Sequence, residues 1–183
     1  MKRYAQYPTL SSPEDVDLWV ARCYTEEELD ELSAAYSQDS PLANYKGGLS
    51  HHMNAIARVH GEAEGVADLQ KLLLSKTIRE PIAVYRFVCF GELLRLWWYT
   101  QRNKLYEYPH FLSTTLLKNH YSMENIKRNR LPIMIGIPQG IPGTFLPEVN
   151  PEQPEFEILL PHHLQVSRIS WNKYVIVNED VTP

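Results

Sequence analysis

PEFEILLP, residues 154–161, places two glutamates two positions apart in a run that otherwise has the composition of a β-strand. Successive side chains of a strand point to opposite faces, so Glu155 and Glu157 share one face while Phe156 and Ile158 share the other. We expect the apolar face to enter a core and the acidic face to present paired carboxylates. An isolated pair of this kind is most often the solvated face of a half-buried strand, so a functional role needs support from other parts of the chain.

Further short apolar runs follow Pro81 and are separated by Pro, Gly and Asn, which is typical of strands joined by turns. These runs are IAVYRFVCF (82–90), HFLSTTLL (110–117), LPIMIGIP (131–138), GTFLPEV (143–149), LQVSRISW (164–171) and KYVIVNE (173–179). GELLRLWWYTQRN (91–103) fits either a helix or a long strand, and its Trp97, Trp98 and Tyr99 are expected in the core.

The segment before Pro81 predicts helices. Ser12 is a candidate N-cap with Pro13 at the first helical position, and Thr25 and Glu28 have the spacing of a capping box. Two further helices are expected within HHMNAIARVHG (51–61) and ADLQKLLLSKT (67–77). Helices followed by strands predict an α+β fold with a mainly antiparallel sheet. We expect one domain over residues 1–183, with a helical part at about 10–78 and a sheet part at about 80–178.

Composition excludes several classes of protein. The 183 residues are 44% hydrophobic and 22% charged, as in globular domains, and no run approaches the ~20 apolar residues of a membrane span. A formal charge of -4 argues against bulk attraction to nucleic acid or to acidic membranes. Cys23 and Cys89 are expected as ordinary core cysteines rather than a disulfide framework. The basic start has no apolar run behind it, so no Sec-type signal peptide is expected.

Three stretches occur in a meaningful order: VYRF with Arg86, FLSTT with Ser113, Thr114 and Thr115, and the E-x-E motif. Singly, each is ordinary strand composition. Together they resemble the arginine, serine-threonine-serine and E-x-E signature of the mono-ADP-ribosyltransferases, in particular the bacterial toxin-like exoenzymes. Phe87 after the arginine and a threonine in place of the final serine depart from the usual pattern.

The resemblance extends through most of the chain. ANYKGGLSHHMNAIAR looks like the family's helix that carries a tyrosine, an asparagine nine residues later and an arginine four residues after that, here Tyr45, Asn54 and Arg58. The similarity covers roughly residues 10 to 178. It implies an ADP-ribosyltransferase-like fold, with N-terminal helices packed on two mainly antiparallel sheets around an NAD cleft.

The resemblance also implies an activity, with NAD as substrate. Cleavage of the bond between nicotinamide and ribose develops positive charge on the sugar, which a fixed carboxylate stabilises. Glu157 is expected in that role, Glu155 is expected to assist the acceptor, and Arg86 is expected to hold the dinucleotide. Ser113 would orient Glu157. The remaining cofactor-binding candidates are Thr114, Thr115, Tyr45, Asn54 and Arg58.

The acceptor is expected to be arginine of a target protein, because E-x-E members of the family modify arginine and EVNPEQP (148–154) adds acidic residues beside the motif. The resemblance further implies a bacterial or phage toxin or effector, with an immunity protein or chaperone as a further partner. Without a signal peptide, the protein is expected to be made in the cytoplasm and either to work there or to leave by a specialised secretion route, unless the chain is a fragment of a larger protein. An NAD glycohydrolase and a non-catalytic NAD-binding or interaction domain stay open as alternatives.

Other interpretations have less support. NIKRNR (125–130) would suit phosphate contacts, so nucleic acid stays open as a binding partner or acceptor, although a solvated charged face or a cofactor-loop cation is favoured. Tyr121, Lys127, Arg128 and Arg130 could contact the cofactor from this segment. The His51-His52 and His162-His163 pairs do not form a chelate, because adjacent side chains diverge, and no metal is expected. No Gly-x-Ser-x-Gly motif supports a serine hydrolase.

Overall fold

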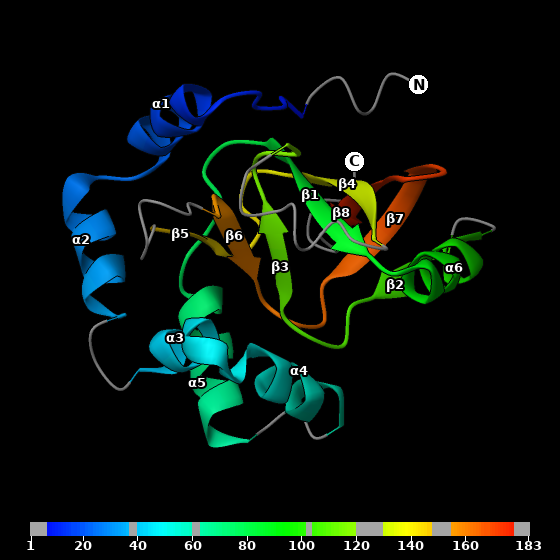
Figure 1. Cartoon of the computed structure of the whole chain (residues 1–183), viewed down its shortest axis with the longest axis horizontal. Helices are drawn as coiled ribbons and strands as arrows, with labels where there is room; N and C mark the ends of the chain where they lie inside the picture. Colours follow the sequence, from blue (N-terminus) through cyan, green and yellow to red (C-terminus); the bar gives the residue numbers. More distant parts are fainter. Residues whose placement is uncertain are drawn as a thin grey trace.

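The computed structural model describes residues 7–36, 40–59, 63–101, 104–119, 130–147 and 155–177. Most of the helices precede the first strand (Figure 1). The helical elements are α1 (Pro13–Cys23), α2 (Glu26–Ala34), α3 (Pro41–Asn44), η2 (Tyr45–Leu49), α4 (Ser50–Val59), α5 (Glu64–Leu74) and α6 (Phe90–Tyr99). The strands are β1 (Ile82–Val88), β2 (Tyr106–Glu107), β3 (Leu112–Thr115), β4 (Leu131–Ile137), β5 (Thr144–Leu146), β6 (Glu157–Leu160), β7 (Gln165–Ser170) and β8 (Lys173–Val177).

Capping side chains begin the first two helices where the sequence predicts. Ser12 accepts a hydrogen bond from the backbone of Asp15, whose carboxylate bonds back to the Ser12 amide, and Thr25 and Glu28 repeat this arrangement at α2. Glu28 also forms an ion pair with Arg79, which ties α2 to the chain just before β1. The segment 91–103, for which helix and strand were both considered, forms α6.

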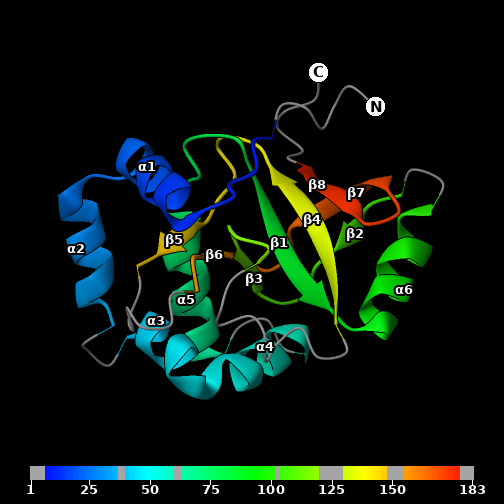
Figure 2. The ribbon, with the colours of Figure 1, turned by 45° about the horizontal axis from the view of Figure 1, so that its top comes forward.

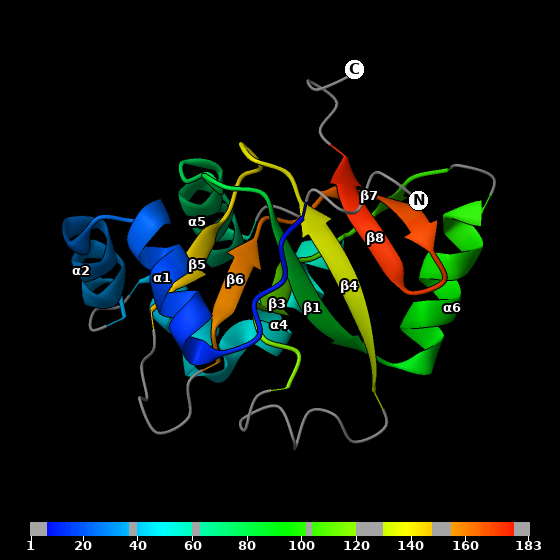
Figure 3. The ribbon, with the colours of Figure 1, turned by 90° about the horizontal axis from the view of Figure 1, so that it is seen from above.

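The strands form one mixed eight-stranded sheet in the order β2-β7-β8-β4-β1-β3-β6-β5, and only the β4–β8 pair is parallel among the described strands. The α+β fold with a mainly antiparallel sheet is therefore confirmed. Where two sheets were expected, β1 and β3 join them through the pair Tyr85–Thr115. Figure 3 shows β1 and β4 side by side along the middle of the sheet, with β7 and β8 beyond them next to α6.

Both faces of β6 are covered, which explains the local sequence EILL. Ile158 and Leu160 belong to a core cluster with Val16 and Trp19 of α1, whereas Leu159 belongs to a second cluster with the helices α2 to α5. A strand buried on both faces carries a continuous apolar run rather than an alternating one. The alternative of a solvated outer face therefore does not hold for β6 itself, and Glu157 lies on the face that the second cluster covers.

The aromatic residues at the end of α6 are exposed, contrary to the prediction that they lie in the core. Leu93 and Leu96 provide the buried side of this helix, while Trp97, Trp98 and Tyr99 are 42%, 71% and 54% exposed. An α-helix at the edge of a sheet buries one stripe only, so consecutive aromatic residues cannot all enter the core. Trp97 instead lies beneath the guanidinium of Arg168, 5.8 Å from the ring centre.

Candidate active site

A cleft of about 800 Å³ opens where the two parts of the sheet diverge between β1 and β3. Residues of the segment from α3 to α4 line it on one side, and residues at the start of α6 line it on the other. Figure 2 shows α3 and α4 below the sheet and α6 at its side. Every residue that the sequence predicted for the site lines this cleft: Tyr45, Asn54, Arg58, Arg86, Ser113, Thr114, Thr115, Glu155 and Glu157. The topology therefore brings together side chains that are far apart in the chain.

Glu157 is the most enclosed acid of the site, with 6% of its surface exposed. It is the first residue of β6 and pairs with Thr115 on one side and Leu146 on the other, so its backbone is fixed by two neighbouring strands. Ser113 Oγ donates a hydrogen bond of 2.6 Å to Glu157 Oε1. Ser113 and Thr115 share one face of β3, which is the reason that the hydroxyl reaches this carboxylate.

Glu155 lies just outside β6, so the strand begins later than the sequence analysis expected. The intervening Phe156 has a φ of 48°, which interrupts the extended backbone before the strand. Phe156 is nonetheless buried in the same core as Ile158, and Glu155 still lines the cleft. Thr115 Oγ1 donates a 2.8 Å hydrogen bond to the Glu155 carbonyl oxygen and so fixes the backbone at this point, while the Glu155 side chain is 45% exposed.

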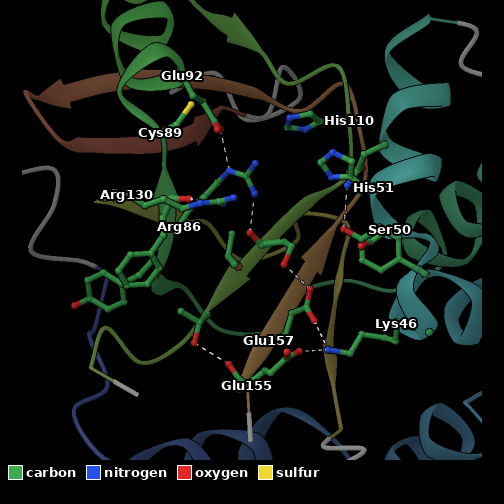
Figure 4. A pocket seen from close by; sticks show the side chains of 18 of the residues that line it. Lys46, Ser50, His51, Arg86, Cys89, Glu92, His110, Arg130, Glu155 and Glu157 are labelled. Atoms are coloured by element: carbon green, nitrogen blue, oxygen red, sulfur yellow. Dashed lines mark hydrogen bonds and ion pairs between the residues drawn. The ribbon is translucent and has the colours of Figure 1, made fainter. Parts of the chain in front are cut away.

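Lys46 is a site residue that the sequence analysis missed. Its ammonium group lies 2.6 Å from Glu157 Oε2 and also donates to the carboxylate of Glu155 (Figure 4). Burial alone would lower the pKa of Lys46, but Glu157 and the hydrogen bonds to both carboxylates outweigh burial and raise it. Two carboxylates this close together need a positive charge nearby. The signal in the sequence that could have identified Lys46 is its position next to Tyr45, in the helix that resembles the family's.

Arg86 reaches across the divergence of the sheet. It projects from β1, and its Nη1 donates a hydrogen bond of 3.0 Å to the Ser113 carbonyl oxygen on β3. Its Nε donates a hydrogen bond of 3.0 Å to the Glu92 carboxylate of α6, a second partner that the sequence analysis did not identify (Figure 4). Burial would lower the pKa of Arg86, but the neighbouring Glu92 carboxylate raises it. The guanidinium is thus charged and held in place, with 17% of its side chain open to the cleft.

The residues Tyr45, Asn54 and Arg58 all come from the helical side of the cleft. Tyr45 is buried against the edge of the Phe111 ring, and its hydroxyl accepts a 3.4 Å hydrogen bond from Asn54 Nδ2. Burial, reinforced by the Glu157 carboxylate, raises the pKa of Tyr45 to about 12. Arg58 is exposed near the end of α4. Thr114 lies on β3, where its hydroxyl donates a hydrogen bond of 2.9 Å to the Ile158 carbonyl oxygen.

His110 and Cys89 are among the further residues that line the cleft and were not anticipated. His110 is 6% exposed, and its Nδ1 has no hydrogen-bond partner within the part of the chain that the structure describes. Burial, with a contribution from Arg86, lowers the pKa of His110 to about 4, so the ring is neutral at physiological pH. Cys89 is exposed at the N-cap of α6, so the expectation of a core cysteine is wrong there and holds for Cys23.

Arg130 also lines the cleft, and its guanidinium lies 3.4 Å from the Phe87 carbonyl oxygen. The other basic and aromatic candidates of that segment, Tyr121, Lys127 and Arg128, and the acidic segment 148–154 lie outside the described residues.

The two histidine pairs lie in different surroundings. His162 is buried and His163 Nδ1 lies next to a carboxylate oxygen of Glu107 at the surface, while His51 and His52 are both exposed on α4. Within the described ranges, no group of three or more His, Cys, Asp or Glu side chains is arranged to hold a metal ion. No described helix has the length and apolar character needed to cross a bilayer.

The chemical capacity of the cleft follows from these contacts. A buried carboxylate held by a hydroxyl can stabilise positive charge that develops on a substrate, and a fixed guanidinium can bind an anionic group such as a phosphate. A second carboxylate, that of Glu155, lies beside the first and is 45% exposed. The combination suits the transfer of a group from an anionic donor to a basic acceptor.

Comparison with known proteins supports this interpretation. The family model described as ADP-ribosyltransferase exoenzyme matches residues 21–182. A search of curated proteins gives no match.

Among solved structures, the ADP-ribosylating toxin BECa of a binary enterotoxin of C. perfringens has a TM-score of 0.73 at 16% identity, over 94% of this chain and 50% of BECa. The Clostridium limosum C3 exoenzyme has a TM-score of 0.64 at 14% identity, over 94% of this chain and 98% of that protein. C3stau2 from S. aureus has a TM-score of 0.63 at 13% identity, over 93% of this chain and 96% of C3stau2. The chain thus spans half the length of BECa, and at these identities the likeness establishes a shared fold.

Proposed function

The chain belongs to the ADP-ribosyltransferase exoenzyme family, and from that premise we propose that it is an NAD-dependent mono-ADP-ribosyltransferase that modifies arginine on a target protein. The observation that carries the proposal is the meeting of Arg86, Ser113 and Glu157 on one cleft of about 800 Å³. A cleft of that volume is within the range of small-molecule and cofactor sites in proteins. Two of the structural neighbours, BECa and C3stau2, were solved with NADH and NAD respectively.

The proposed reaction assigns a separate task to each charged group. Arg86 binds the phosphates of NAD, because a guanidinium matches phosphate oxygens in charge and shape. Glu157 lies beside the ribose and stabilises the positive charge that develops there, and Ser113 fixes the orientation of that carboxylate. The low exposure of Glu157 strengthens this stabilisation, because charges interact more strongly away from water.

The bond changes are those of a substitution at the anomeric carbon of the ribose. The bond between this carbon and the nicotinamide nitrogen breaks, and nicotinamide leaves as a neutral molecule with the bonding electron pair. A guanidino nitrogen of the acceptor forms the new bond, and Glu155 takes the proton that this nitrogen releases. The 45% exposure of Glu155 suits contact with an acceptor that arrives from solvent.

The proposal includes a biological role as a toxin or effector. The protein is made in the cytoplasm and reaches its target cell by a specialised secretion route, and an immunity protein or a chaperone accompanies it. The toxin role, as distinct from the delivery route and the accompanying partner, is supported by the family and by the toxins among the structural neighbours.

The decisive experiment is incubation of the protein with biotinylated NAD and a cell lysate, followed by mass spectrometry of any labelled protein. We expect a discrete labelled band, with ADP-ribose on arginine. Nicotinamide release without a labelled band would instead identify an NAD glycohydrolase. Modification of another residue type or of nucleic acid would refute the arginine assignment, and NAD binding without nicotinamide release would indicate a non-catalytic domain.

A further inference from the structure

Lys46 holds the position between the two glutamates of the motif. Its ammonium group donates to the carboxylates of both Glu155 and Glu157, and the side chain is only 19% exposed. Ser113 donates to one oxygen of the Glu157 carboxylate, Oε1, and Lys46 donates to the other oxygen, Oε2. A cation that belongs to the protein therefore fills the place where the two acids converge (Figure 4).

The backbone that carries Lys46 is irregular. Lys46 lies in η2, where two helices meet across a kink, and it is followed by Gly47 and Gly48, of which Gly48 has a φ of 106°. A Cβ added at Gly47 or Gly48 would meet no atom within 4 Å, so neighbouring side chains do not confine this segment. On the other side, Tyr45 is buried and anchors the start of the segment. Lys46 is thus positioned between an anchored residue and two glycines, at a kink whose positive φ glycine adopts readily.

The contacts of Lys46 oppose the proposed chemistry while they persist. A cation 2.6 Å from Glu157 offsets the negative charge that should stabilise the sugar. The same ammonium donates to the Glu155 carboxylate and so occupies an oxygen that would take the proton released by the incoming guanidino group. An arginine acceptor, by contrast, brings its own positive charge to these acids and can replace what the lysine supplies.

We propose that Lys46 is an internal substitute for the acceptor: its ammonium occupies the guanidinium subsite formed by Glu155 and Glu157 until an acceptor arginine displaces it. This inference rests on the proposed function and defines the acceptor subsite of that same cleft. The lysine pairs with the two carboxylates in the absence of acceptor, and it moves aside when the acceptor binds.

The test compares steady-state kinetics of wild type, Lys46→Met and Lys46→Arg, with NAD and the small guanidino acceptor agmatine. Methionine has a similar length and no charge, so agmatine no longer competes with a tethered cation. We expect the KM for agmatine to fall roughly tenfold in Lys46→Met, the scale of one charged hydrogen bond, with a smaller change in the KM for NAD. Lys46→Arg keeps the competing charge and should keep a KM at least as high as wild type.

Lys71→Met is the matched control, because it removes an exposed lysine of α5 outside the cleft and should leave both constants as in wild type. A higher agmatine KM in Lys46→Met, or a collapse of kcat that Lys46→Arg restores, would overturn the proposal and show that the lysine positions the two carboxylates throughout the reaction. Circular dichroism establishes that each variant is folded.

A second measurement does not depend on the enzymatic activity of any variant. In wild type with isotope-labelled lysine side chains and no NAD, agmatine should shift the NMR signal of Lys46, which is assigned by its loss in Lys46→Met. An unchanged signal at saturating agmatine would also overturn the inference. Failure of the proposed function looks different, since wild type would then release no nicotinamide or would not modify agmatine, whatever the NMR titration shows.

Discussion

Glu157 concentrates the interactions of the site on one carboxylate. It is fixed by its strand neighbours, it accepts from Ser113 on one oxygen, and it contacts Lys46 on the other. A group that is oriented before the substrate arrives costs no reorganisation during the reaction, so most of the proposed rate enhancement should depend on it.

Glu157→Gln keeps the size of this side chain and removes its charge. We expect nicotinamide release to fall by roughly 10²–10³-fold, the usual cost of losing one preorganised electrostatic group. The measurement is nicotinamide formation by liquid chromatography at saturating NAD. Glu107→Gln is the control, because Glu107 is an exposed glutamate outside the cleft. A Glu157→Gln rate within a few fold of wild type would remove Glu157 from the proposed mechanism.

Glu155→Gln should separate the two halves of the reaction. If this carboxylate serves the acceptor, the variant loses transfer to protein or agmatine and keeps cleavage of NAD, because the groups around the ribose are unchanged. Label transfer and nicotinamide release are measured on the same samples. Equal loss of both activities would reject the division of roles between Glu155 and Glu157.

His110 should make the stability of the protein sensitive to acid. Burial and Arg86 lower the pKa of His110 to about 4 in the folded protein, whereas an unfolded chain has a value of about 6.5. The unfolded state therefore binds the proton more readily, and the free energy of unfolding falls as the pH drops from about 6.5 toward 4.

His110→Gln should lose less stability on acidification. Between about pH 7 and 5, we expect the decrease in the free energy of unfolding to be smaller by roughly 2 kcal/mol than in wild type. Urea unfolding at both pH values measures it. His52→Gln, which changes an exposed histidine of α4, should follow wild type. Identical decreases in wild type and His110→Gln would show that His110 is not the titrating group.

At the scale of elements, β6 is held between β3 and β5, and the close approach of β5 depends on Gly143. This residue has a φ of 142°, and an added Cβ would lie 2.5 Å from Leu160 Cδ2 and 3.0 Å from the Leu159 carbonyl oxygen. The leucine methyl group can move, but the backbone oxygen of a central strand cannot. Glu157 is on this same strand, so the packing of Gly143 helps to position the site.

Gly143→Ala should lower the free energy of unfolding by about 2–4 kcal/mol, because it combines backbone strain with a steric clash. Gly91→Ala is the matched control: a Cβ at Gly91 meets nothing within 4 Å, and this glycine lies in the first turn of α6. We expect that variant to stay within about 1 kcal/mol of wild type. Urea unfolding curves measure the free energy of unfolding of both variants, and equal stability of the two would contradict the structure around Gly143.

At the scale of the whole molecule, the cleft lies between two groups of elements with separate cores. One core joins α1 to the sheet, and the other joins the helices α2 to α5 to the opposite face. Arg86 crosses from β1 to β3, and Lys46 connects the helical side to β6. A dinucleotide bound in this cleft would contact both sides, so its binding should stabilise the whole fold.

NAD should therefore raise the melting temperature, and Glu157→Gln allows the measurement without turnover. At about 100 times the dissociation constant, a ligand stabilises the folded state by about 2.7 kcal/mol, which corresponds to roughly 5–10 °C for a chain of this size. Differential scanning calorimetry over a range of NAD concentrations measures the shift. Nicotinamide alone should have a smaller effect, because it lacks the phosphates that Arg86 would bind. An unchanged melting temperature at millimolar NAD would contradict a dinucleotide site.

The sequence by itself determined the α+β class, the capped starts of α1 and α2, most of the strands and nine of the residues that line the cleft, because these depend on local periodicity, capping chemistry and motif order. Only the tertiary structure decided which faces are covered. It buried both faces of β6, exposed Trp98 on α6, and brought Lys46 and Glu92 to the acids and the arginine of the site. The physical reason is that burial and ion pairing depend on neighbours from distant parts of the chain, which local patterns do not specify.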